Sequence, residues 1–123
     1  MTQTHPIIVG TTDEIQEGEA LYVSSAITGT APIAVFHTET GEFYALDDRC
    51  THGQASLAEG FIKDELVECP RHAATFCLRN GKVLSLPATV DTNTHQIEIV
   101  GQNILLYPGV PATDAAVNEP EIK

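Results

Sequence analysis

The stretch of sequence that decides how this chain is interpreted is Cys50-Thr51-His52, followed after sixteen residues by Cys69-Pro70-Arg71-His72. A C-x-H step is shorter than the spacing of two to four residues that zinc fingers use. In an extended loop, however, residues i and i+2 point to the same side, so Cys50 and His52 can reach two metals that lie side by side. Cys69 and His72 can do the same from a second loop. The pattern therefore predicts two irons, one held by both thiolates and the other by both imidazoles.

The composition is that of one globular domain. The chain has 123 residues, of which 42% are hydrophobic, so it can bury one core but not two. No run approaches the ~18 apolar residues that a membrane span requires. The N-terminus from Met1 to Pro6 lacks the basic start and apolar stretch of a signal peptide. We therefore expect a cytoplasmic protein.

The chain is strongly acidic, with 17 Asp and Glu against 6 Lys and Arg and a formal net charge of -11. This charge argues against binding to nucleic acid or to an anionic membrane. The segment 47–82 is close to neutral, because it contains all the basic residues except Lys123. The acidity of the rest of the chain serves solubility or steers a partner that carries basic patches.

The remaining cysteine and histidines give no second ligand set. With Cys50 and Cys69 used, only Cys77 is left, so no internal disulfide can form without dismantling the site, which fits a reducing compartment. Cys77 follows Phe76 in an expected strand, and this position favours a buried and inert thiol. The other histidines stand alone in the sequence, and we expect them to lie on the surface or to form hydrogen bonds. They are His5, His37 and His95.

Short apolar runs separated by turn residues predict a mostly β chain that forms a small sandwich or barrel. Asn80-Gly81 is a strong hairpin signal. A single helical turn is expected over 12–17, with Thr12 as its cap and Gly18 as its end. From Pro108 onward the chain is expected to be a surface tail. The expected strands are Ile7–Val9, Ala20–Ser24, Ile33–His37, Phe43–Leu46, Leu66–Glu68, Val83–Leu86, Gln96–Val100 and Ile104–Tyr107.

Over about positions 5 to 107 the chain resembles the Rieske-type ferredoxins of bacterial aromatic ring-hydroxylating oxygenase systems. Besides the four metal ligands, the matching residues are Gly18-Glu19, Phe43-Tyr44-Ala45, Leu57 to Gly60, Gly81 and Pro87-Ala88. The resemblance implies an all-β fold, with an antiparallel β-sandwich base and a small inserted cluster-binding subdomain. It places a single domain at 1–107, the subdomain at about 47–77 and a tail at 108–123.

The resemblance also implies the cofactor and the role of each ligand. One 2Fe-2S cluster would be bound, with Cys50 and Cys69 on the inner iron and His52 and His72 on the outer iron, which faces solvent. The loop at Pro87 would close over the cluster as a third wall. Catalytic residues are not expected in such a protein.

Four positions separate this chain from the high-potential respiratory members of the family. Ala55 and Arg71 stand where those members have a disulfide-forming pair of cysteines, and Ala74 and Phe76 stand where they have Ser and Tyr hydroxyls that donate to cluster sulfur. Without these donors the reduced cluster is less stabilised, so we expect a low reduction potential of roughly −150 mV. Ala73 and Cys77 also depart from the family, which usually has Gly and often Asp there.

The function implied is that of an electron carrier and not of an enzyme. The ferredoxin would take single electrons from a flavin-dependent reductase and pass them to the terminal oxygenase of a system for aromatic hydrocarbon catabolism. Both contacts would be transient. Two alternatives stay open at this point. One is a small Rieske-like subunit of another oxidoreductase complex, such as nitrite reductase, and the other is a structural zinc module built on the same four ligands.

Overall fold

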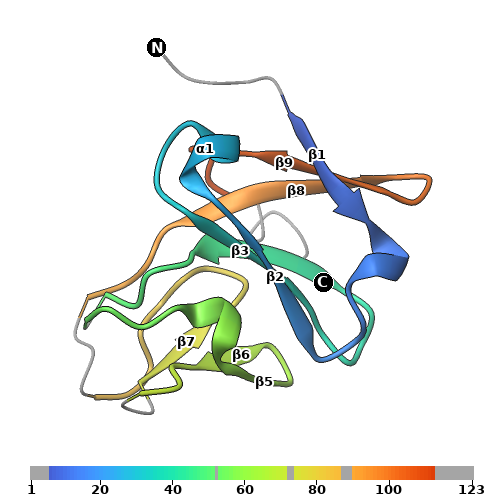
Figure 1. Cartoon of the computed structure of the whole chain (residues 1–123). Helices are drawn as coiled ribbons and strands as arrows, with labels where there is room; N and C mark the ends of the chain where they lie inside the picture. The colour runs from blue at the N-terminus through green and yellow to red at the C-terminus, as the bar shows by residue number, and fades with distance from the viewer. Residues whose placement is uncertain (1–5, 52, 72–73, 87–89, 113–123) are drawn as a thin grey trace.

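The computed structural model describes residues 6–51, 53–71, 74–86 and 90–112. Strands are the main regular structure in this part of the chain and its helices are short, so the all-β prediction is confirmed (Figure 1). None of the described helices is long and apolar enough to cross a membrane. The elements are β1 (Ile7–Thr11), η1 (Thr12–Glu14), β2 (Glu19–Val23), α1 (Ser25–Thr28), β3 (Ile33–His37), β4 (Phe43–Asp47), η2 (Leu57–Glu59), β5 (Phe61–Lys63), β6 (Leu66–Glu68), β7 (Thr75–Cys77), β8 (Thr94–Val100) and β9 (Asn103–Tyr107).

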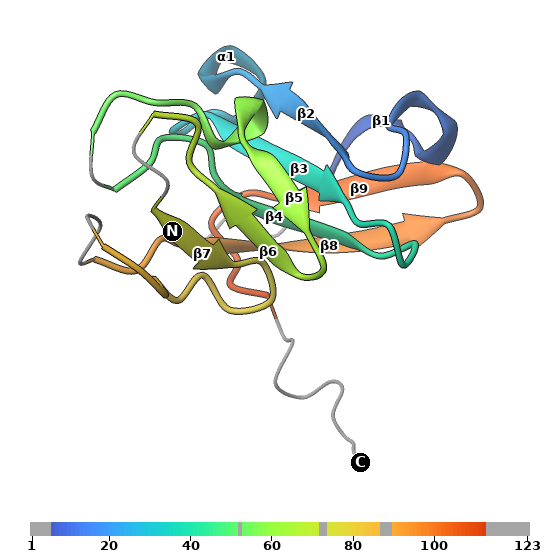
Figure 2. The same ribbon diagram turned by 90° about the horizontal axis from the view of Figure 1, so that it is seen from below.

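Six of the strands form one antiparallel sheet in the order β1-β9-β8-β4-β3-β2. Strand β8 joins its two halves, because it pairs with β4 at Ala45↔His95 and Leu46↔Thr94 and with β9 from Gln96 to Val100. The two halves fold over each other (Figure 2). Between them lies a buried apolar cluster, which we call the base core. It consists of Ile15, Val23, Ile33, Val35, Ala45, Ile104 and Leu106.

The remaining three strands form a small second sheet, in the order β5-β6-β7. It packs against the outer face of β3 and β4 and encloses a second apolar cluster, which we call the site core. Strand β3 contributes to both cores: Ile33 and Val35 point into the base core, whereas Ala34 and Phe36 point into the site core. This agrees with the alternation of side chains along a strand. Burial on both faces of β3 thus explains why its apolar residues do not alternate with polar ones.

Several elements differ from the sequence predictions at their edges. The helical turn is the 3-10 helix η1, and its cap is Thr11 and not Thr12, because the side chain of Glu14 reaches back to the Thr11 N–H (2.9 Å). The expected strand 83–86 is wrong, since only Val83 pairs, with Phe76. Backbone hydrogen bonds join Lys82 and Leu84 to β7, but the N–H of Val83 donates to Asp91 Oδ1 at 2.9 Å and pairing does not continue beyond Val83. Strand β5, helix α1 and helix η2 were not predicted, because each is too short to show a period.

A hydrogen bond at Gly81 joins the two ends of the segment 81–92. The carbonyl of Gly81 accepts this hydrogen bond from the N–H of Thr92 at 2.9 Å. The backbone of Gly81 has φ +76°, and a Cβ at this position would overlap the carbonyl oxygen of Thr92. Both its conformation and its close approach therefore require glycine.

We predict that Gly81→Ala lowers the free energy of unfolding by more than about 2 kcal/mol, because left-handed strain and backbone overlap add together. Gly101→Ala is the matched control, since Gly101 also has positive φ (+62°) but open space around it. It should lose only about 1 kcal/mol. Urea titrations of both variants measure the difference. Equal losses would show that the contact with Thr92 has no role.

Candidate metal centre

Two loops of equal length carry the predicted ligands. The first cysteine loop (50–55) is closed by a hydrogen bond from the N–H of Cys50 to the carbonyl of Ala55, at 3.0 Å. The second cysteine loop (69–74) is closed by the equivalent bond from the N–H of Cys69 to the carbonyl of Ala74, at 2.7 Å. In each loop the cysteine is the first residue, and its backbone N–H closes the loop by bonding to the carbonyl of the last residue.

The residues that flank the two loops are also paired in the same way. Arg49 and Ser56 form an antiparallel bridge around the first loop. Glu68 and Thr75 pair around the second loop, at the ends of β6 and β7. Each loop is therefore the tip of a hairpin. One tip joins β6 to β7 in the small sheet, and the other lies between β4 and η2.

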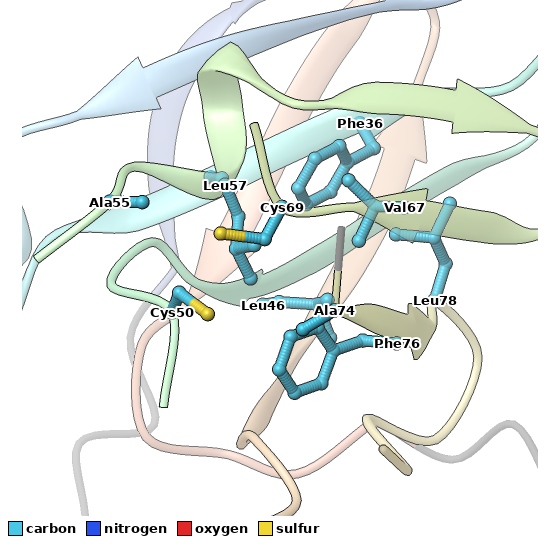
Figure 3. Close-up of a cluster of buried hydrophobic side chains, with 11 residues drawn as sticks. Phe36, Leu46, Cys50, Ala55, Leu57, Val67, Cys69, Ala74, Phe76 and Leu78 are labelled. Atoms are coloured by element: carbon cyan, nitrogen blue, oxygen red, sulfur yellow. The ribbon is translucent and has the colours of Figure 1, made fainter. Parts of the chain in front are cut away.

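The two thiols are buried in the site core. Cys50 and Cys69 are each 1% exposed, and neither forms a disulfide. Figure 3 shows both side chains at one end of this core, whose opposite end is formed by Val67 and Leu78. The charged form of a thiol is unfavourable in apolar surroundings unless a cation compensates it. Two buried cysteines that form no disulfide, at one end of an apolar core, therefore suit a soft metal centre.

The histidines of the predicted ligand set, His52 and His72, lie outside the described residues, as do Ala73 and Pro87. The structure therefore shows where the two predicted thiolate ligands lie, and the assignment of all four ligands stays a prediction. By sequence, His52 is the third residue of the first cysteine loop and His72 the fourth of the second. Elsewhere in the described part of the chain, no group of three or more Cys, His, Asp or Glu side chains could hold a metal ion.

The segment 81–92 is hydrogen-bonded to the first cysteine loop and to the start of β7, directly after the second cysteine loop. The hydroxyl of Thr51 donates to the carbonyl of Val90 at 2.6 Å. On the other side, Leu84 N–H donates to the carbonyl of Thr75 at 2.7 Å, and Thr75 N–H donates to Ser85 Oγ at 3.1 Å. The described residues on both sides of Pro87 are thus held beside the site, as a third wall requires.

One segment beside the site carries exposed apolar side chains, which we call the apolar rim. Three side chains of the segment 81–92 are largely exposed: Leu84 (53%), Leu86 (75%) and Val90 (60%). Exposed apolar side chains that lie close together commonly mark a surface that contacts another protein. The rim lies at the end of the molecule opposite the β8–β9 turn (Figure 1).

Asp48 organises the approach to the first cysteine loop, and the sequence analysis missed it. Its carboxylate Oδ1 accepts hydrogen bonds from Ser56 Oγ (2.8 Å) and from Ala58 N–H (2.9 Å). Its backbone N–H donates to the carbonyl of Pro32, and its carbonyl accepts from Leu57 N–H. An acid immediately before a ligand loop was visible in the sequence, but nothing there showed that it was buried.

Asp47 and His95 join β4 to β8 below the site. Gly109 N–H donates to His95 Nδ1 (2.9 Å), so the ring proton lies on Nε2, which donates to Asp47 Oδ1 at 2.8 Å. Burial raises the pKa of Asp47, but the hydrogen bonds from His95 and Asn93 outweigh it, and the net pKa is lowered. The expected hydrogen-bonding role of His95 is confirmed, and so is that of His37, whose Nδ1 donates to the carbonyl of Ile15.

Cys77 differs from its prediction. It is free but only partly buried. Strand β7 directs Phe76 into the site core, and Cys77, as the next residue along the strand, faces away from it. The expectation of a buried cysteine is therefore wrong, and Cys77 points away from the side of the strand that faces the other two thiols.

Comparisons with known proteins agree on one family. The model of the Rieske 2Fe-2S domain matches residues 5–98. The 3-phenylpropionate/cinnamic acid dioxygenase ferredoxin subunits of Shigella boydii and Shigella sonnei are each 45% identical over 94 residues, which covers 76% of this chain and 84% of each relative.

Solved structures give the same result. In a complex of reduced oxygenase and oxidized ferredoxin in carbazole 1,9a-dioxygenase, one chain is 31% identical, with a TM-score of 0.78, 88% of this chain covered and 96% of that chain. The ferredoxin of carbazole 1,9a-dioxygenase from Nocardioides aromaticivorans is 26% identical, with a TM-score of 0.77 over 85% of this chain and 99% of that one. A nitrite reductase small subunit from Mycobacterium tuberculosis, at 18% identity and TM-score 0.73, covering 82% and 92%, shares the fold.

Proposed function

The chain belongs to the Rieske 2Fe-2S domain family, and we propose that Cys50 and Cys69 hold the inner iron of its cluster while His52 and His72 hold the outer one. The cofactor is a Rieske-type 2Fe-2S cluster, and the chain is the ferredoxin of an aromatic dioxygenase system, an electron carrier and not an enzyme. The observation that carries the ligand proposal is the pair of equivalent loops, each beginning with a buried cysteine that forms no disulfide.

The bound cluster supplies the site for one stored electron. The residues of the chain do the rest. The site core excludes water from the thiolate side, so the sulfur atoms of Cys50 and Cys69 lie in apolar surroundings. His52 and His72 would complete the coordination through one ring nitrogen each, and the other nitrogen of each ring would then be available to solvent. An electron would therefore leave over the histidine edge, which is the shortest route to a partner.

The partner that receives the electron is the terminal oxygenase, and we propose that it docks on the apolar rim formed by Leu84, Leu86 and Val90. Interfaces of electron carriers are small and weak, which allows rapid exchange of partners. The electron donor is proposed to be a flavin-dependent reductase. The net charge of -11 would steer basic surfaces of either partner towards the molecule. Free cysteines are consistent with the proposed cytoplasmic location.

The two alternatives are weaker. Likeness to the nitrite reductase small subunit is one of fold at 18% identity, whereas the dioxygenase ferredoxin subunits reach 45%. A zinc module would be colourless, and its relatives would not be ferredoxins.

We predict that the reduction potential is roughly −150 mV, at the low end for Rieske centres. The supporting observation is that Ala74 and Phe76 are fully buried in the site core and offer no hydroxyl to cluster sulfur. Titration with redox dyes, monitored by visible circular dichroism, measures the potential. A value well above 0 mV would refute the prediction.

We predict that His72→Ala abolishes the Rieske visible and paramagnetic spectra, because the outer iron loses a ligand. His37→Gln is the matched control, since His37 lies on β3, bonds to Ile15 and should leave the spectra intact. Iron and sulfide analysis accompanies the spectra. A full cluster in the His72→Ala protein would show that the ligand assignment is wrong, and stoichiometric zinc without iron in the unsubstituted protein would support the zinc module instead.

We predict that Leu86→Asp weakens the oxygenase complex. Its side chain is 75% exposed, so a charge there costs little stability but disrupts an apolar contact. The KM for the ferredoxin in oxygenase turnover should rise about fivefold to tenfold, with the reduction potential unchanged. Val100→Asp adds the same charge at the distant β8–β9 turn and should leave the KM alone. Equal effects of the two substitutions would point to overall charge and not to the rim.

A further inference from the structure

Asp48 is a carboxylate in an unusual place. It is 4% exposed, and it stands two residues before Cys50. Among the residues that the structure describes, Arg79 forms an ion pair with Glu65 and the His95 ring donates a hydrogen bond to Asp47, but no Lys, Arg or His side chain pairs with Asp48. Since adjacent Cα atoms are about 3.8 Å apart, its Cα lies no more than about 7.6 Å from that of Cys50.

The equivalent position in the second cysteine loop makes the carboxylate more informative. Two residues before Cys69 stands Val67, which is fully buried in the site core. Each loop has an equivalent closing hydrogen bond and an equivalent flanking pair of residues. However, an acid precedes the first loop and an apolar side chain precedes the second. Loop closure alone therefore does not require a carboxylate at this position.

The hydrogen bonds of Asp48 explain its position in the fold. The 3-10 helix η2 begins after Ser56, whose own side chain does not cap it. Asp48 does so instead, because its Oδ1 accepts from Ala58 N–H and from the Ser56 hydroxyl. Together with the bond from Leu57 N–H to its carbonyl, these contacts tie the chain entering the first cysteine loop to the chain leaving it.

These hydrogen bonds do not account for the negative charge. The Oδ1 of asparagine could accept both of them, and asparagine would avoid the penalty of burying a carboxylate without a cation. A buried negative charge close to Cys50 would, however, oppose the addition of an electron to the iron that this cysteine binds. The charge of Asp48 and its capping of η2 would therefore both affect the first cysteine loop.

We propose that Asp48 is a positioning residue for the first cysteine loop and that its buried charge lowers the reduction potential of the cluster. The proposal rests on the proposed function in one respect, namely that Cys50 is a cluster ligand. Asp48→Asn separates the two roles, because it removes the charge and keeps the acceptor. Asp48→Ala removes both.

The test compares four substituted proteins, each loaded with its cluster, by redox titration and by the rate at which the visible spectrum bleaches in air. Asp48→Asn should keep the spectrum and shift the potential upward. Glu59→Gln, which removes an exposed charge on η2, should give a smaller upward shift that disappears at high salt. Asp48→Ala should bleach at least about fivefold faster than the unsubstituted protein, a loss equivalent to one hydrogen bond. Ser56→Ala, which keeps the charge, should bleach faster without an upward shift.

Each result decides a different point. A potential in Asp48→Asn no higher than in Glu59→Gln would overturn the role of the charge. Bleaching of Asp48→Ala at the unsubstituted rate would overturn the positioning role. If Asp48→Asn does not retain the cluster, Ser56→Ala decides, and an upward shift there would overturn the proposal. An unsubstituted protein without a Rieske spectrum would overturn the ligand assignment and this proposal together, whereas an intact spectrum with unchanged potentials would overturn only the latter.

Discussion

The burial of two reduced cysteines at one end of an apolar core is the constraint on which the rest of the structure depends. Cys50 and Cys69 are each 1% exposed, and a thiolate in such surroundings is stable only beside a cation. The chain meets this requirement by fixing the two cysteines through their own backbones, with one hydrogen bond closing each loop. Because backbone groups set the loop geometry, the remaining loop side chains are available as ligands or as contact surface.

Strand β3 connects this requirement to the stability of the whole domain. Its alternate side chains enter the base core and the site core, so Phe36 lies beside the cysteine end of the molecule while Val35 packs between the halves of the large sheet. A change in one core is therefore felt in the other through a single strand. The small sheet has only three short strands and would be marginal alone. It is stable because it covers a face of β3 and β4 that would otherwise be exposed.

The sequence predicted most of this fold and only part of the site. Apolar runs and turn residues located the strands of the large sheet, because each is long enough to show its pattern. Strand β5 and helix η2 were missed because a single turn or three residues show no period. The expected strand 83–86 was wrong because only Val83 pairs with β7, and beyond it the N–H of Thr75 donates to the side chain of Ser85. Spacing identified Cys50 and Cys69, but the role of Asp48 could not be predicted, since burial of an acid depends on Ser56 and Ala58 folding back over it.

The distribution of hydrogen bonds also explains how one small domain can hold its cofactor tightly and its partners weakly. Backbone bonds close the cysteine loops, and such bonds break only when the loop itself unfolds. The apolar rim belongs instead to the segment 81–92, which is joined to the loops by a few bonds, among them Thr51 to Val90 and Thr75 to Ser85. A partner that contacts this surface therefore does not need to break the backbone hydrogen bonds that position Cys50 and Cys69. Under the proposed function, the acidic remainder of the chain would attract basic surfaces of the oxygenase and of the proposed reductase from a distance, and the near-neutral segment around the site would leave the final contact to the apolar side chains.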